Sequence, residues 1–149
     1  MHSIMLWMLA IVSTAESKNP NVILIMADDL GYYDLSCYGH PSIKTPVIDR
    51  LAKEGVRLTS FYAGSTICTP SRMALLTGSY PSRLGWSKGV IGYIMKKGQG
   101  MSQEALTMAE IFKEQGYRTG IFGKWHLGDE PQFLPHEQGF EESFYINKS

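Results

Sequence analysis

One short apolar run, bounded by polar and turn-forming residues, most constrains what this chain can fold into. Val22–Ala27 is continuously apolar between Asn-Pro-Asn and Asp-Asp, which is typical of a strand buried on both faces of a parallel sheet. Residues 56–62 and 117–122 are the other two strand candidates. Short buried strands of this kind occur in sheets covered by helices.

Helix start and stop signals lie between the strand candidates. They include a threonine followed by proline, a capping box and glycines at helix ends. The expected helices run from Pro46, after Thr45, to a stop at Gly55, from Pro70 to Thr77 before Gly78, and from Thr107–Glu110 to Gly116. Strands alternating with helices predict an α/β fold with a mostly parallel sheet flanked by helices. Residues 85–103, rich in Gly and Lys, show no clear period and are interpreted as a loop.

Composition and charge exclude two classes of partner. The chain has 149 residues, about one ordinary domain, and 44% hydrophobic residues, enough for a sizeable core. Its formal net charge is zero. Nucleic-acid binding and attachment to an anionic membrane surface both need clustered excess Lys and Arg, so no nucleic acid is expected as a partner.

The N-terminal segment has the pattern of an export signal. An apolar run, Ile4–Val12, is followed by small residues at 13–15 and polar residues at 16–19, as at a signal-peptide cleavage site. We expect residues 1–17 to be a signal peptide and the chain to be exported: secreted, periplasmic or lysosomal. A buried first strand or helix is the other interpretation. The run is shorter than the roughly 20 residues that span a bilayer, so stable membrane insertion is not expected.

Two polar clusters follow the first and third strand candidates. Asp28-Asp29 ends the first, and Gly123–His126 ends the third. Ligands of open α/β sheets bind beyond the carboxyl ends of the strands, so both clusters should meet at one rim. Two adjacent carboxylates repel each other, and a hard divalent cation would compensate. Alternatively, one of the acids caps the following turn.

Cys68 lies immediately before a predicted helix start, in the string Cys-Thr-Pro-Ser-Arg. Unbonded N–H groups and the helix dipole stabilise a negatively charged atom there. Arg72, one helical turn later, can offer a planar fork to an oxyanion. A buried cysteine before an ordinary helix is the alternative. The only other cysteine, Cys37, is expected to be a small buried residue.

These strings resemble the signatures of a known enzyme family. Cys68–Arg72 with Leu76-Thr77-Gly78 resembles the first signature of the type I sulfatases, and Gly116–Thr119 with Gly123–Gly128 resembles the second. The opening Pro20–Gly31 also matches, and the resemblance covers about residues 20–140. It is nearest to the arylsulfatase and N-acetylgalactosamine-6-sulfatase branch. The resemblance implies an alkaline-phosphatase-like α/β sandwich, with residues 20–149 as the N-terminal part of the catalytic domain.

The resemblance also implies a mechanism. A formylglycine-generating enzyme oxidises the cysteine, here Cys68, to formylglycine. One hydroxyl of the hydrated aldehyde attacks the sulfur of an aryl or carbohydrate sulfate ester, and collapse of the other expels sulfate. A Cys68 used in this way is unavailable for a disulfide with Cys37.

Site roles are carried over from the family position by position. Asp28, Asp29 and the modified Cys68 would bind a calcium ion. The catalytic residues would be Cys68 together with three residues that orient the diol and bind the sulfate oxygens: Arg72, Lys124 and His126. Trp125 is expected to pack behind the site.

The chain is much shorter than members of this family, whose further calcium ligands and acid catalyst come later in sequence. We therefore expect a truncated fold and no turnover by the 149-residue chain alone. Two alternatives stay open: a phosphonate or phosphate monoester hydrolase of the same superfamily, and a non-catalytic truncated product.

Overall fold

The computed structural model describes residues 19–87, 89–91 and 98–147. The chain divides into two compact units, Met1–Leu30 and Gly31–Ser149. The expected signal peptide, residues 1–17, lies outside the described residues.

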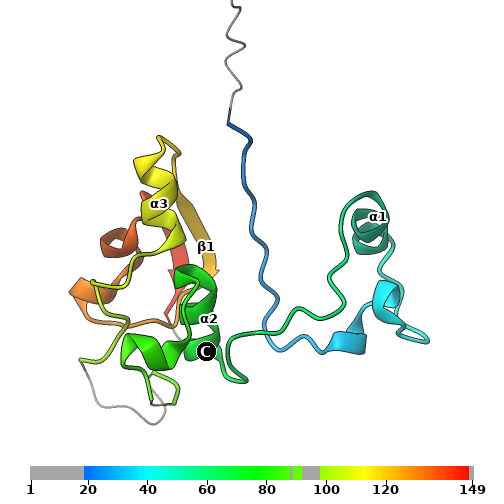
Figure 1. Cartoon of the computed structure of the whole chain (residues 1–149), viewed down its shortest axis with the longest axis horizontal. Coiled ribbons are helices and arrows are strands. Elements are labelled where there is room, and N and C mark those ends of the chain that lie inside the picture. Colours follow the sequence, from blue (N-terminus) through cyan, green and yellow to red (C-terminus); the bar gives the residue numbers. More distant parts are fainter. Residues whose placement is uncertain (1–18, 88, 92–97, 148–149) are drawn as a thin grey trace, which may run out of the picture. The chain divides into compact units, whose positions relative to one another are not determined.

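The described part of the first unit, residues 19–30, contains no helix or strand. The prediction of a strand over Val22–Ala27 is therefore wrong for this structure. The side chains of Ile23 and Ile25 are 84% and 85% exposed, and the segment runs as an extended tube (Figure 1). An apolar extended segment becomes a strand only when a neighbouring strand bonds its N–H and C=O groups. The described residues of this unit provide no such neighbour.

Helix α1, Pro46–Glu54, begins and ends as predicted. Thr45 is its N-cap residue, and the N–H of Gly55 donates to the carbonyl of Leu51, 2.9 Å away. The Thr45 hydroxyl does not cap the helix but donates to Asp49 Oδ1 at 2.9 Å. Asp49 Oδ2 in turn accepts from the Ser36 hydroxyl at 2.5 Å. A polar cluster thus ties the start of α1 to the preceding 3-10 turn.

The second strand candidate, residues 56–62, is irregular, so that prediction is also wrong. Val56 and Tyr62 are 86% and 84% exposed. The physical reason is again that no strand lies beside this segment among the described residues.

Helix α2, Cys68–Thr77, starts two residues earlier than expected and ends at Gly78. Gly78 adopts the left-handed conformation, φ 62°, that glycine allows at a helix end. Helix α3, Met108–Glu114, has the predicted capping box. The Thr107 hydroxyl accepts from the Glu110 N–H at 3.2 Å, and Glu110 Oε2 accepts from the Thr107 N–H at 2.7 Å.

The sheet of the described residues has two parallel strands, β1 (Gly120–Lys124) and β2 (Glu142–Ile146). β1 lies two to three residues later than predicted, and β2 was not predicted. Phe122 pairs with Phe144 in the register, and Lys124 pairs with Ile146. Helices α2 and α3 are in contact.

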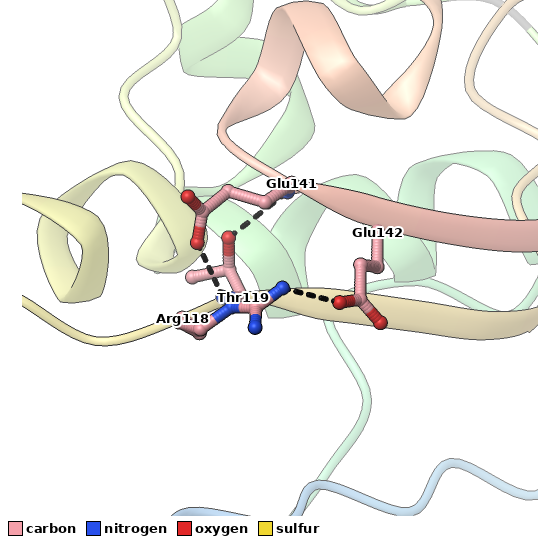
Figure 2. A network of polar contacts seen from close by, with 4 residues as sticks. All are labelled: Arg118, Thr119, Glu141 and Glu142. Carbon is pink, nitrogen blue, oxygen red and sulfur yellow. Dashed lines mark hydrogen bonds and ion pairs between the residues drawn. The ribbon is translucent and has the colours of Figure 1, made fainter.

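Polar side chains join the two strands where they begin (Figure 2). Arg118 forms an exposed ion pair with Glu142, 2.5 Å between Nη2 and Oε1. The Thr119 N–H donates to Glu141 Oε2 at 3.2 Å, and the Glu141 N–H donates back to the Thr119 hydroxyl at 3.1 Å. These bonds help to set the parallel register.

The buried core joins α2, the segment after β1, and residues 101–105. It consists of six side chains that are at most 9% exposed: Met73, Leu76, Met101, Ala105, Trp125 and Leu127. Ile121 of β1 and Tyr145 of β2 pack against it. No helix in the described ranges is both long and apolar enough to span a bilayer.

Candidate active site

Cys68 is the first residue of α2 and is half-buried. The N-cap residue is Ile67, whose carbonyl accepts the N–H of Ser71 at 3.1 Å. The N–H groups of the first turn therefore face the helix end at which Cys68 lies. Pro70 fits this turn because its missing N–H costs no helical hydrogen bond. An anionic group on residue 68 would be stabilised by this helix end, as the sequence analysis expected.

Neither cysteine is bonded to the other; both are described as free thiols. Cys37 is half-buried in a 3-10 turn, so its expected full burial is wrong. The turn is short and contacts α1, which leaves Cys37 only partly covered.

Arg72 joins the two sequence signatures. Its side chain is buried, with 9% exposure, and Nη1 donates to the main-chain oxygen of Lys124 at 2.8 Å. Lys124 is the last residue of β1, so its side chain leaves from the carboxyl end of that strand. The residues expected to contact an oxyanion thus come from adjoining segments.

His126 is buried, with 2% exposure, two residues after β1. Its Nε2 lies 2.9 Å from the main-chain oxygen of Ile91, and its own carbonyl accepts from the Thr69 hydroxyl at 2.9 Å. The backbone of His126 has φ 61°. A histidine in this left-handed region costs about 1–2 kcal/mol, so surrounding contacts must hold it there.

Asp29 is the other non-glycine residue of the described chain with positive φ, at 55°. Both strained positions are therefore residues that the sequence analysis assigned to the site. Backbone strain of this kind is concentrated at functional sites. The two outliers support a functional role for the segments that contain Asp29 and His126.

The expected metal ligands belong to different units. Asp28 and Asp29 are exposed in the first unit, whereas Cys68 lies in the second. Within the described ranges, no group of three or more His, Cys, Asp or Glu side chains is arranged to hold a metal ion. The donor chemistry of Asp28 and Asp29 does fit calcium, because both offer hard carboxylate oxygens. The assignment of calcium to Asp28, Asp29 and Cys68 stays a prediction.

Trp125 is a core side chain, next to His126 in the chain. It is 1% exposed, its Nε1 donates to the Phe133 carbonyl at 2.9 Å, and its ring meets Phe140 edge-on at 6.1 Å. Glycine at 128 and 100 allows Phe133 to approach closely; a Cβ on either would lie 2.3 Å from a Phe133 atom. The contacts of Trp125 and Phe133 therefore fix the course of the chain after His126.

Two residues of this region, Thr69 and Ile91, were not predicted from the sequence. Thr69 is fully buried beside Cys68, and its hydroxyl accepts from the N–H of Ile91 at 3.2 Å. Ile91 lies in the stretch interpreted as a loop and is 5% exposed. The small polar residue inside Cys-x-Pro-Ser-Arg was the available signal for Thr69, whereas Ile91 had none.

Comparison with known proteins places these features in a family. A family model described as Sulfatase matches residues 20–148. Arylsulfatase A of Homo sapiens is 52% identical over 128 residues, which cover 85% of this chain and 25% of that protein. N-acetylgalactosamine-6-sulfatase of Canis lupus familiaris is 41% identical over 137 residues, covering 84% of this chain and 25% of that protein. The chain thus spans about a quarter of the length of these relatives.

Solved structures agree on the fold. The crystal structure titled Ps i-CgsB superposes with a TM-score of 0.83 at 39% identity, covering 89% of this chain and 29% of the other. The sulfatase PsFucS1 from Pseudoalteromonas sp. gives 0.77 at 37% identity, covering 88% and 26%. The prediction of a helix-flanked, mostly parallel α/β fold of the alkaline-phosphatase-like type is confirmed at the level of fold class.

Proposed function

Because the chain belongs to the sulfatase family, we propose that it forms the nucleophile-bearing part of a sulfuric ester hydrolase that uses a formylglycine made from Cys68. The observation that carries the proposal is the Arg72–Lys124 hydrogen bond, 2.8 Å long. It joins the helix that begins at Cys68 to the end of β1. The two segments with the most distinctive sequence are thereby brought together.

Formylglycine, when formed, would supply a diol with one hydroxyl to take up the sulfuryl group and a second whose deprotonation releases sulfate. The chain's own contribution at residue 68 is electrostatic. The first turn of α2 directs N–H groups and the positive end of the helix dipole toward that position. Sulfate oxygens and an ionised hydroxyl would both be stabilised there.

Three further side chains are proposed to bind and orient the reacting groups. Arg72 lies one helical turn after Cys68 and brings a buried positive charge. Lys124 is the last residue of β1, and His126 lies two residues later. Both would contact sulfate oxygens or the modified residue. A preorganised donor of this kind lowers a reaction barrier by roughly 3 kcal/mol.

Calcium is the proposed metal, with Asp28, Asp29 and the modified Cys68 among its ligands. Its charge would offset the repulsion between two adjacent carboxylates and the negative charge of a sulfate group. The left-handed backbone of Asp29 supports a binding role for this turn.

The proposed substrate class is an aryl or carbohydrate sulfate ester, and the proposed partner is a formylglycine-generating enzyme acting before the chain folds. We also propose export to a secretory, periplasmic or lysosomal compartment. The apolar run Ile4–Val12, followed by small residues, supports export.

A chimera tests the proposal without requiring activity from a quarter-length chain. The matched segment of human arylsulfatase A is replaced by the corresponding residues of this chain and coexpressed with the generating enzyme. We expect hydrolysis of 4-nitrophenyl sulfate above that of the same chimera with Cys68→Ala. A folded chimera that is converted at Cys68 but hydrolyses only an aryl phosphonate ester would indicate the alternative esterase. One that hydrolyses neither substrate would contradict the proposal.

A further inference from the structure

Thr69 connects three separate segments of the site through one hydroxyl group. It is the residue immediately after Cys68 and has no exposed surface. The hydroxyl donates to the main-chain oxygen of His126 at 2.9 Å and accepts from the main-chain N–H of Ile91 at 3.2 Å. This buried hydroxyl both donates and accepts, and removing it would leave two main-chain groups without that partner.

The same two partners also meet each other. His126 Nε2 lies 2.9 Å from the main-chain oxygen of Ile91. Thr69, His126 and Ile91 therefore form a closed ring of hydrogen bonds. It passes through the first turn of α2, the segment after β1, and residue 91.

The Ile91 contact specifies where the imidazole proton lies. A carbonyl oxygen can only accept, so Nε2 must carry the hydrogen, and in the neutral ring the lone pair is then on Nδ1. In a neutral histidine, the hydrogen bond made by one ring nitrogen determines which nitrogen carries the proton. Here Nε2 makes that bond to the main-chain oxygen of Ile91, and the N–H of Ile91 donates to the Thr69 hydroxyl.

We propose that Thr69 is a positioning residue that, through Ile91, sets the tautomer and orientation of His126. The Thr69 hydroxyl also secures the carbonyl of a residue whose backbone is strained at φ 61°. The consequence is that the lone pair of the neutral His126 imidazole stays on Nδ1. This inference deepens the proposed function and rests on it for its catalytic meaning. The tautomer of the His126 imidazole is nevertheless measurable without turnover.

Nitrogen NMR of the histidine ring in the 149-residue chain tests the inference. The shifts of the two ring nitrogens differ between the two neutral tautomers and the charged ring, so they identify the form present. Wild type and Thr69→Ser should show the Nε2–H form at His126. Thr69→Val, which keeps the shape and removes the hydroxyl, should show a mixture of both tautomers. Its Ile91 amide should exchange with solvent about five-fold faster, as for the loss of one hydrogen bond.

Thr77→Val is the matched control. Thr77 lies in the same helix, and its hydroxyl donates within the helix to the Met73 carbonyl at 2.7 Å. That variant should leave the His126 ring and the Ile91 amide unchanged.

Each outcome decides the matter. A folded Thr69→Val with an unchanged His126 tautomer and unchanged Ile91 exchange overturns the inference, as does a Thr69→Ser that behaves like Thr69→Val. If Thr69→Val does not fold, an Nδ1–H form in wild type or Thr69→Ser overturns it, and Nε2–H in both supports it. Failure of the chimera to hydrolyse sulfate would leave these ring measurements standing, so the two failures are distinguishable.

Discussion

The guanidinium of Arg72 donates to the main-chain oxygen of Lys124 across 2.8 Å, and the side chain is 9% exposed. A residue proposed to bind substrate charge thus also fastens helix α2 to the end of β1. Its two roles can be separated by measuring stability apart from activity.

Replacing Arg72 with Met should lower the free energy of unfolding by about 2 kcal/mol, since a charged donor to a part-buried carbonyl is lost. Arg72→Lys should recover only part of this, because lysine keeps the charge but not the planar fork. Urea unfolding measures both. The control is Arg118→Met at the ion pair of Figure 2, whose side chains are 80% and 60% exposed. It should cost no more than about 1 kcal/mol, and an equal loss in both variants would contradict the assigned role of Arg72.

Gly128→Ala should be more destabilising than Gly78→Ala. Gly128 has φ 138°, and a Cβ there would lie 2.3 Å from Phe133 Cβ and 3.1 Å from Gly100 Cα. Gly78 has φ 62° with nothing within 4 Å of an added Cβ, so only the conformational cost of about 1–2 kcal/mol applies. Comparison of their urea midpoints checks the order. Equal midpoints would mean that Phe133 can move away from residue 128. The packing of Phe133 against the chain after His126 would then be less rigid than described.

The acid stability of the α1 segment should depend on Asp49. The hydrogen bond from Ser36 holds the pKa of Asp49 below its ordinary value of 3.8, and Thr45 adds to the effect. Since the folded-state pKa is the lower one, this stabilisation is present above about pH 4 and is lost as the pH falls through the folded-state pKa. Thermal unfolding from pH 7 to pH 3 should show wild type losing stability relative to Asp49→Asn at the acid end. A difference between the two proteins that does not vary with pH would refute the assignment.

Local signals in the sequence predicted the helices well. The capping box at Thr107–Glu110 and the glycine stop at Gly78 act through bonds within a few residues, so they need no tertiary context. The start of α2 was misplaced by two residues because proline fits anywhere in a first helical turn, here at Pro70. The strand predictions at Val22–Ala27 and residues 56–62 failed for a different reason: a strand requires a partner that apolar sequence alone does not specify.

The site also has features that the sequence predicts and features that it does not. Arg72, Lys124 and His126 could be predicted because short strings carry them. Their connections depend on contacts distant in sequence, such as that between Thr69 and Ile91, which no local pattern encodes. The strained backbone at Asp29 and His126 is likewise visible only in three dimensions.

Calcium binding should depend on the first unit. Asp28→Asn and Asp29→Asn are expected to weaken calcium affinity at least about tenfold, because each removes a charged oxygen ligand. Glu54→Gln, at an exposed position on α1, is the control and should bind as wild type. Isothermal titration of chelator-treated protein with calcium measures the affinities, and equal affinity in all three variants would refute the metal assignment.

The most direct test of the account is the mass of the tryptic peptide covering residues 58–72, which contains Cys68 and no other cysteine. After coexpression with a formylglycine-generating enzyme, we expect a lower mass for this peptide, as thiol is replaced by aldehyde. The peptide of residues 19–44, with Cys37, serves as the internal control and should keep its thiol mass. An unmodified thiol at Cys68, or a disulfide joining the two peptides, would contradict the proposed nucleophile.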